Sequence, residues 1–433
     1  MNKTSKCNIM CDDGQKLTVY NSLTGKISRF SENARREVLE AFKVPTDNIM
    51  CNDFLLKQGF LIDNSVDEDE IITKSVDKLI KNEEMLFLTI YPTEACNFRC
   101  KYCPENTVPL YMDIKTSEKL LQFLDKVLYQ FKRLVIAWFG GEPLLGDHII
   151  NSLSSEIKKL CRKHNVIFSA TMTTNGYFLN AAMIRKMLGN NVFSYCISLD
   201  GMPEIHDQQR QLKNGNPTWK KIIENLIQIR DTVASRMFTI IIRTNVTSSI
   251  CNCSNKFFKL LSEEFGADRR FLFMWKKAED WGNIEEADKG LICSYSDFLS
   301  FLNAAKQFGM HNNILSRSLN VFDRICETSI QNALVVFPDG RISKCSRDVQ
   351  PEITTLGTID ELLLRPEYYL EKNLQLLYKN NCSKCSNYYR CLGVGCPLED
   401  NECRLDLVYT QNVLLSISDA DIPCGVIKSF GGI

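Results

Sequence analysis

Apolar and polar positions follow a regular pattern through the middle of this chain. Short apolar segments of strand length recur at 86–91, 134–139, 166–172, 193–199, 237–243 and 270–275. Between them, apolar residues return every three or four positions, as in 117–131, which predicts amphipathic helices. Six strand–helix units in a row predict an α/β fold with a parallel sheet curled into a partial (β/α)6 barrel of the TIM type.

The segments on either side have other patterns. Near the N-terminus, two strand-like segments flank a turn at Leu23-Thr24-Gly25, and Ser31 then precedes a helical pattern as its expected N-cap. The acidic run at 67–70 is interpreted as a solvated linker or a helix start. After residue 310 the alternation stops. We therefore expect a small α+β module at 1–85, the partial barrel at 86–310 and a Cys-rich domain at 311–433.

The composition narrows the class of protein. The 433 residues carry 52 Lys+Arg and 52 Asp+Glu, a formal net charge of zero, which argues against a general nucleic-acid or anionic-membrane surface. The apolar segments are far shorter than the ~20 residues that span a bilayer. The first residues also lack the apolar stretch of a secretory signal. We expect a cytoplasmic protein with no nucleic-acid and no membrane partner.

Cysteine is the abnormal residue type, since the chain has 19 cysteines against 4 histidines. Thiols stay reduced in the cytoplasm, and a core of this size needs no disulfides. Ligation of metal by sulfur is the better interpretation, and all-thiolate sites are typical of zinc or of iron–sulfur clusters.

Polar or glycine-rich segments follow each of the predicted strands. They are Cys96, Gly140-Gly141-Glu142-Pro143, Thr173-Thr174-Asn175-Gly176, Ser198-Leu199-Asp200-Gly201, Arg243-Thr244-Asn245 and Trp275-Lys276. Turn formation alone explains any one of these segments. Because the carboxyl ends of parallel strands meet at one end of a barrel, the segments together predict an active site there.

The first of these segments continues as Cys96-x3-Cys100-x2-Cys103. Three thiolates this close can ligate three irons of a cubane, which leaves the fourth iron open to a substrate or cofactor. The alternative from spacing alone is a three-cysteine zinc site with a distant fourth ligand.

This motif, with Tyr102 before its last cysteine and Gly140-Gly141-Glu142-Pro143 downstream, resembles the radical S-adenosylmethionine (SAM) superfamily. The resemblance implies that the open iron of a [4Fe–4S] cluster chelates SAM. An electron from the reduced cluster then cleaves SAM to methionine and a 5′-deoxyadenosyl radical, which abstracts hydrogen from the substrate.

The resemblance also implies which residues bind SAM. Tyr102 matches the aromatic residue beside the adenine, and Gly140, Gly141 and Glu142 match the segment near the methionyl amino group. Ser198 and Arg210 match positions near the ribose and the SAM carboxylate. Taken without the family, Glu142 is equally an N-cap or a structural carboxylate, and Arg210 is a solvated surface residue.

Eight further cysteines lie in the C-terminal quarter, at Cys326, Cys345, Cys382, Cys385, Cys391, Cys396, Cys403 and Cys424. Cys382-x2-Cys385 taken alone also suits a zinc ribbon. The whole pattern resembles the SPASM extension of radical SAM enzymes, which implies two auxiliary [4Fe–4S] clusters and therefore three clusters in all.

The same resemblance assigns cluster ligands by position. Cys326, Cys345 and Cys396 are expected to hold the first auxiliary cluster, and Cys382, Cys385 and Cys391 the second. Cys424 is favoured to close the second cluster. Cys403 is the alternative there. For the fourth iron of the first cluster, the alternatives are Cys403 as a ligand or an open position that binds a substrate thiolate. The remaining cysteines are interpreted as small buried hydrophobes, at positions 7, 11, 51, 161, 196, 251, 253 and 293.

Enzymes with this extension mostly modify peptides or proteins, so the resemblance implies a radical SAM oxidoreductase acting on a peptide. A peptide maturase that installs a thioether or other crosslink in a ribosomally made peptide is favoured over an anaerobic sulfatase-maturating, formylglycine-forming enzyme. In the sulfatase branch, an Asp base follows the cysteine equivalent to Cys345. Ser346 follows it here, and an unperturbed hydroxyl is a poor proton acceptor.

Residues 1–85 are interpreted as an abbreviated, winged-helix-like module whose sheet edge binds a leader peptide by strand addition. The expected partners are a peptide or small protein substrate and a low-potential electron donor such as a flavodoxin or ferredoxin. The alternative from a different class is a non-catalytic zinc or iron–sulfur scaffold.

Overall fold

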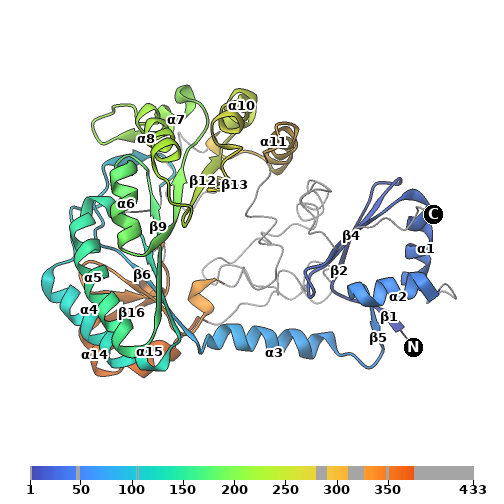
Figure 1. Ribbon diagram of the computed structural model, residues 1–433, viewed down its shortest axis with the longest axis horizontal. Helices are drawn as coiled ribbons and strands as arrows, with labels where there is room; N and C mark the ends of the chain where they lie inside the picture. The colour runs from blue at the N-terminus through green and yellow to red at the C-terminus, as the bar shows by residue number, and fades with distance from the viewer. Residues whose placement is uncertain are drawn as a thin grey trace. The chain divides into compact units, whose positions relative to one another are not determined.

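The computed structural model describes residues 2–44, 49–103, 105, 107–278, 290–310, 326–347 and 351–374. The chain divides into two compact units, whose elements Figure 1 labels. One unit comprises residues 1–80, 314–326 and 375–433, and the other comprises 81–313 and 327–374. Within the described ranges, no helix is both long and apolar enough to cross a membrane.

The N-terminal unit contains a three-stranded antiparallel sheet in the order β2-β3-β4 and a separate pairing of β1 with β5. Its elements are β1 (Asn2–Thr4), β2 (Asn8–Asp12), β3 (Leu17–Asn21), β4 (Ile27–Phe30), α1 (Glu32–Lys43), α2 (Ile49–Gln58), β5 (Leu61–Asp63) and α3 (Glu68–Lys81). Its core joins Leu17 and Val19 of β3 to Val38 of α1 and Leu55 of α2. The sheet therefore buries one face against the apolar sides of two helices.

The turn predicted at Leu23-Thr24-Gly25 connects β3 to β4. Gly25 has a φ of +69°, a left-handed conformation that glycine adopts without steric cost. Ser31 occupies the N-cap position of α1 as expected, although its side chain makes no capping hydrogen bond. Position and pattern were therefore sufficient to locate this helix start.

The acidic run at 67–70 begins α3 as one of the two interpretations expected, but one of its carboxylates is not solvated. Glu68 is buried and accepts hydrogen bonds from the Ser5 hydroxyl and from the Lys6 backbone amide. These donors compensate the loss of water around the carboxylate. They belong to a segment some sixty residues earlier, which charge patterning along the helix cannot indicate.

The larger unit is built on a nine-stranded sheet in the order β13-β12-β10-β9-β8-β6-β14-β15-β16. The six strands predicted from the apolar segments are confirmed: β6 (Met85–Ile90), β8 (Arg133–Trp138), β9 (Ile167–Thr174), β10 (Val192–Ser198), β12 (Thr239–Val246) and β13 (Phe271–Lys277). Neighbours among these six pair in parallel. The predicted α/β class with a mostly parallel sheet is therefore correct.

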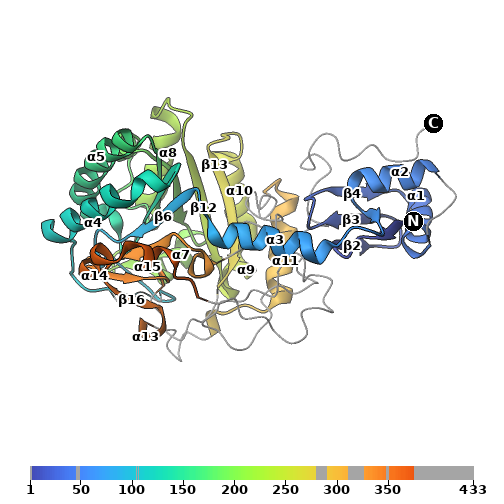
Figure 2. The same ribbon diagram turned by 90° about the horizontal axis from the view of Figure 1, so that it is seen from below.

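Helices connect these strands. Figure 1 shows α4, α5 and α6 together on one side of the sheet, and Figure 2 shows α4 and α5 again from below. The helices are α4 (Ile114–Val127), α5 (Asp147–His164), α6 (Ala181–Gly189), α7 (Pro203–Gln209), α8 (Trp219–Thr232), α9 (Ser248–Asn252), α10 (Ser254–Phe265) and α11 (Tyr295–Gln307). Each long helix turns a buried apolar stripe toward the strands, as the periodicity predicted.

The sheet continues beyond residue 310, where the alternation of the sequence stops. β14 (Ala333–Val336) pairs in parallel with β6, so that Val336 lies opposite Ile90. It then forms an antiparallel hairpin with β15 (Arg341–Ser343), and β16 (Thr355–Thr358) pairs with β15. Three short helices follow this extension: α13 (Pro351–Thr354), α14 (Ile359–Leu364) and α15 (Pro366–Glu371).

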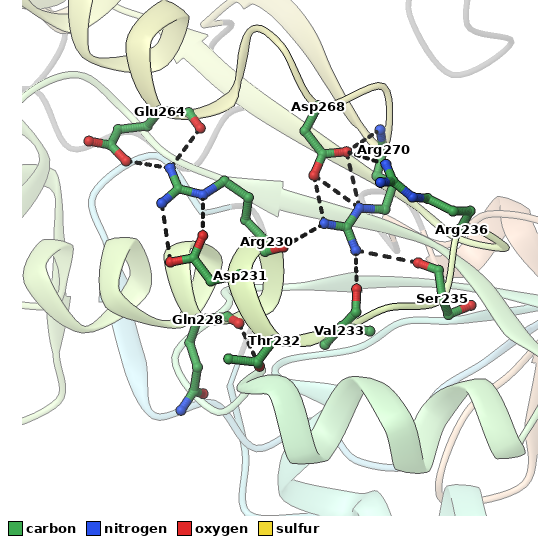
Figure 3. A network of polar contacts seen from close by, with 10 residues as sticks. All are labelled: Gln228, Arg230, Asp231, Thr232, Val233, Ser235, Arg236, Glu264, Asp268 and Arg270. Atoms are coloured by element: carbon green, nitrogen blue, oxygen red, sulfur yellow. Dashed lines mark hydrogen bonds and ion pairs between the residues drawn. The ribbon is translucent and has the colours of Figure 1, made fainter.

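A buried arginine joins the end of α8 to the start of β13 (Figure 3). Arg270 donates to the backbone carbonyls of Val233 and Arg230, the latter at 2.8 Å. Its Nη2 also lies 2.6 Å from Oδ2 of Asp268. Carbonyls at a helix C-terminus have no partner within the helix, and here a guanidinium supplies one.

We predict that Arg270→Leu lowers the free energy of unfolding by about 3 kcal/mol, because it leaves the half-buried carboxylate of Asp268 without its guanidinium and two helix-end carbonyls without their donor. Arg236→Leu is the matched control. Arg236 lies 4.0 Å from the same Asp268, but its side chain is 78% exposed. We expect it to change the free energy of unfolding by less than about 0.5 kcal/mol. Denaturant unfolding measures both, and equal effects would contradict this account.

Candidate active site

The three cysteines of the first motif lie together at the carboxyl end of the sheet. Cys96, Cys100 and Cys103 line one pocket of about 210 Å³. A short strand in their loop, β7 (Phe98–Cys100), pairs antiparallel with β11 (Arg210–Leu212), which places Arg210 opposite Cys100. This pairing brings together two segments about a hundred residues apart. Other residues predicted to bind SAM line the same pocket: Tyr102, Gly140, Gly141 and Ser198.

Burial dominates the chemistry of these thiols. It raises the pKa of Cys96, of Cys100 and of Cys103 to about 11 in each case. A thiol in this environment becomes a thiolate only when a cation offsets the burial, and a bound metal does so. Among the described residues, no group of His, Cys, Asp or Glu side chains is arranged to hold a single metal ion. The three thiols in this pocket are the type of donor that ligates the irons of an iron–sulfur cluster.

The two glycines at the end of β8 allow another segment to approach closely. A Cβ on Gly140 would lie 2.3 Å from the carbonyl oxygen of Thr93, and one on Gly141 would lie 2.4 Å from that of Glu94. Gly140 also has a φ of +115°, which side chains of L-residues rarely allow. Any larger residue would therefore push the glycine loop away from the segment that leads into Cys96.

Glu142 is fully buried and is not among the residues that line the pocket. Its Oε1 accepts from the Leu144 amide at 3.0 Å and from the Thr174 hydroxyl at 2.7 Å. Its Oε2 accepts from the Asn175 amide at 2.7 Å. Burial raises the pKa of Glu142, and these donors act in the opposite direction. The N-cap and structural interpretations are thus both realised, because the carboxylate ties the glycine loop to the end of β9.

Arg210 is buried, so its interpretation as a solvated surface residue is wrong. Its Nη1 donates to the phenol oxygen of Tyr102 at 2.7 Å, and the guanidinium lies 5.7 Å from the ring centre of Phe98. The phenol in turn donates to the carboxylate of Asp200. A charge in so dry a place needs a counter-charge, and Oδ2 of Asp200 lies 3.9 Å from Arg210.

Asp200 and Asn245 are site residues that sequence reasoning did not assign. Asn245 donates through its side chain to the Tyr102 phenol at 3.1 Å and through its backbone amide to Asp200 at 2.8 Å. Burial raises the pKa of Asp200. Both residues belong to the strand-end segments after β10 and β12, so their place at the site could be inferred, whereas their contacts could not.

The polar atoms at the pocket fit a ligand with a carboxylate. The side chain of Arg210 is 7% exposed, and its Nε is a buried donor without a hydrogen-bond partner. Guanidinium donors match carboxylate oxygens in geometry and charge. Together with three thiols in the same pocket, this donor fits a [4Fe–4S] cluster and SAM, the groups expected from the sequence.

The C-terminal cysteines are described in part. Cys326 is half-buried and Cys345 is buried. Cys382, Cys385, Cys391, Cys396, Cys403 and Cys424 lie outside the described residues. Cys345 precedes a turn in which the carbonyl of Ser346 accepts from the phenol of Tyr91. Arg347 of this turn lines the pocket, so Cys345 lies two residues from its wall.

The hydroxyl of Ser346 is paired with a carboxylate, since it donates to Oε1 of Glu327 at 2.6 Å. Among the cysteines interpreted as buried hydrophobes, five are buried as expected: Cys7, Cys11, Cys51, Cys161 and Cys293. Cys196 and Cys251 are half-buried. Cys253 is exposed, so that interpretation is wrong there, because it follows α9 in a surface connection to α10.

The family model of the Radical SAM superfamily matches residues 90–247. A GTP 3',8-cyclase of Nostoc sp. is 31% identical over 145 residues, which cover 32% of this chain and 42% of that protein. A cysteine-type anaerobic sulfatase-maturating enzyme of Clostridium perfringens is 25% identical over 342 residues, which cover 72% of this chain and 88% of that protein.

Two solved structures share the fold. The enzyme anSMEcpe with bound AdoMet has a TM-score of 0.57 at 21% identity, over 77% of this chain and 96% of that one. Streptococcus suis SuiB bound to its precursor peptide SuiA has a TM-score of 0.51 at 13% identity, over 92% of this chain and 96% of that one.

We predict that Glu142→Gln raises the Kd for SAM about tenfold, because a glutamine must turn its NH2 toward a backbone or hydroxyl donor, at a cost of about 1–3 kcal/mol. Calorimetric titration of the cluster-loaded protein measures this change. If Glu142 acts by holding the glycine loop against the end of β9, the unfolding temperature of the Glu142→Gln protein also falls in the absence of SAM. Glu156→Gln, at an exposed carboxylate on α5, is the control and should change neither quantity. An E142Q protein with wild-type stability and affinity would contradict the bracing role.

Proposed function

Because residues 90–247 of this chain form a radical SAM domain, we propose that the protein is a peptide maturase that binds a precursor peptide through its N-terminal unit. The domain implies a [4Fe–4S] cluster and SAM. The similarity to an anaerobic sulfatase-maturating enzyme supports a protein or peptide as the substrate. What we propose beyond this is the substrate, a ribosomally made peptide, and the bond formed, a thioether or other crosslink. The observation that carries it is the pocket that joins Cys96, Cys100 and Cys103 to Arg210.

The chain's own residues supply the binding of both groups. Cys96, Cys100 and Cys103 would ligate three irons, and Arg210 would meet the SAM carboxylate with its unpaired Nε. When bound, the reduced cluster supplies the electron that cleaves SAM to a 5′-deoxyadenosyl radical. Tyr102 and Asp200 hold the guanidinium in place.

The C-terminal cysteines extend this proposal to two auxiliary clusters. Cys345 is buried two residues from the pocket wall, a position from which a cluster would stand close to the substrate. The proposed ligands are Cys326, Cys345 and Cys396 for one cluster, and Cys382, Cys385, Cys391 and either Cys424 or Cys403 for the other. A flavodoxin or ferredoxin in the cytoplasm would supply the electrons.

Within the described residues of the N-terminal unit, β4 is a terminal strand of its sheet, and we propose that the peptide binds there. The Asn21 amide donates to the Lys26 carbonyl at 2.9 Å, so hydrogen-bonded pairs alternate from there along β3 and β4. The amide of Ile27 consequently points away from β3. In the described part of this unit, β4 is the edge of its sheet on that side.

The opposite edge is less suitable. The Ser22 amide donates to the Cys7 carbonyl, so the outward amides of β2 belong to Asn8 and Met10, and the Asn8 amide already donates to the Ser5 carbonyl at 3.4 Å. We therefore propose that the precursor peptide adds as a strand beside β4. SuiB is a structural neighbour whose crystal contains a precursor peptide.

We predict that Ile27→Pro weakens binding of the precursor peptide at least tenfold, because proline removes an outward amide and leaves the hydrogen bonds to β3 intact. Met10→Pro removes the equivalent amide at the other edge and should weaken binding less than twofold. The probe is a labelled peptide from the short reading frames that flank the gene, followed by fluorescence anisotropy. SAM cleavage without peptide should be unchanged in both variants. Equal losses in both would refute the choice of β4.

A second candidate is formylglycine formation in a sulfatase. The relative that covers 72% of this chain is a cysteine-type anaerobic sulfatase-maturating enzyme. The carboxylate of Glu327 behind the Ser346 hydroxyl could also stand in for the missing Asp base. The hydrogen bond between Ser346 and Glu327 is the observation that supports formylglycine formation as a second candidate.

We predict that a sulfatase-derived peptide with its target cysteine gains no aldehyde when the enzyme turns over SAM, as hydrazide capture and mass spectrometry would show. Under the same conditions the flanking-gene peptide should lose hydrogen at a new crosslink. Aldehyde formation that disappears in Glu327→Gln and persists in the exposed-site variant Glu352→Gln would instead establish the second candidate.

A further inference from the structure

The loop that carries the three cysteines contains a buried hydrogen-bond donor without a partner. It is the side-chain nitrogen Nδ2 of Asn97, the residue directly after Cys96. An unpaired buried donor costs about 1–3 kcal/mol, and buried polar groups in native proteins nearly always have a partner. The acceptor for this donor is therefore to be sought in a bound group.

The orientation of the Asn97 amide follows from its neighbours. The Tyr177 backbone amide can only donate, and it donates to Oδ1 of Asn175 at 3.0 Å. Asn175 must then turn its Nδ2 away from Tyr177, and this nitrogen donates to Oδ1 of Asn97 at 2.8 Å. Since the oxygen of Asn97 is thereby engaged, its NH2 group faces the other way.

The neighbours of Asn97 line the cluster pocket, although Asn97 itself is not among the lining residues. Cys96 and Phe98, on either side of it in the chain, line that pocket, and so does its partner Asn175. The Phe98 backbone amide already donates to Sγ of Cys96 at 3.4 Å. The acceptors that a [4Fe–4S] cluster brings to this place are thiolate and sulfide sulfurs.

We propose that the side-chain amide of Asn97 donates a hydrogen bond to a sulfur of the cluster that Cys96 ligates, and that this bond raises the reduction potential of the cluster. The inference rests on the cluster of the proposed function and adds a residue that tunes it. Hydrogen bonds to cluster sulfurs are among the factors that set such potentials. The positive end of an N–H dipole stabilises the reduced, more negative cluster. Asn175 acts as a positioning residue, because it fixes which end of the Asn97 amide faces the sulfurs.

The test compares three variants of the cluster-loaded protein in the absence of SAM and peptide. Asn97→Asp keeps an oxygen toward Asn175 and replaces the donor by a second oxygen. Asn97→Leu removes the donor without adding charge. Asn175→Asp leaves Asn97 in place but presents a carboxylate to it, so that the Asn97 amide turns its NH2 toward Asp and its oxygen toward the cluster.

Redox titration followed by electron paramagnetic resonance measures the midpoint potential, and electron–nuclear double resonance in D2O counts the exchangeable protons coupled to the reduced cluster. We expect all three variants to shift the potential in the negative direction and to lose one exchangeable-proton coupling. The shift in the neutral N97L protein separates the effect of the hydrogen bond from that of added charge.

The two levels of the proposal fail differently. A wild-type protein that holds no [4Fe–4S] cluster would overturn the proposed function and this inference with it. Cluster-loaded N97D and N97L proteins with the wild-type potential and the full set of proton couplings would overturn this inference alone. Because aspartate has nearly the same shape as asparagine, the N97D protein provides the test if the N97L protein fails to fold.

Discussion

The site depends on one short strand pairing, that of β7 with β11. The register sets Arg210 opposite Cys100. Backbone hydrogen bonds extend the pairing at both ends, because the Lys101 amide donates to the Gln209 carbonyl and the Lys213 amide donates to the Asn97 carbonyl. A loop of three cysteines would otherwise be free to move. Tied into a ladder, it holds its thiols at fixed positions beside the only kind of side chain that is always positively charged.

Around this pairing, buried charges are compensated one by one. Asp200 faces Arg210 through the phenol of Tyr102, and Glu142 takes three donors from the loops on either side of it. The oxygens of each carboxylate accept hydrogen bonds from neighbouring groups and thereby hold those groups in position. Such networks are costly when incomplete, and they therefore specify one arrangement of the loops. Arg270, at the opposite end of the strands, is compensated in the same way: its guanidinium pairs with Asp268 and donates to a carbonyl at the end of α8.

The sequence predicted the parallel strands because each is a short, mostly apolar segment bounded by polar turns. It predicted the site because cysteines and glycines follow some of those segments. It placed Asp200 and Asn245 in strand-end segments near the site but did not indicate their roles, which depend on contacts between different strand ends. Arg210 taken by residue type alone was expected at the surface, since burial of a guanidinium is visible only once its counter-charge is in place. Glu68 differed for the same reason, because its donors come from a distant strand connection.

The parallel pairing of β14 with β6 has a consequence for how the chain folds during synthesis. Ala333 pairs opposite Phe87, so one side of β6 stays open until the ribosome has made nearly all of the larger unit. An open, apolar strand edge is the usual starting point for aggregation, and contacts between such distant residues form slowly. All the residues that line the pocket except Arg347 precede β14 in the chain. The nascent protein thus assembles its reactive centre first and covers its most vulnerable edge last, which places the period of greatest risk of misfolding late in translation.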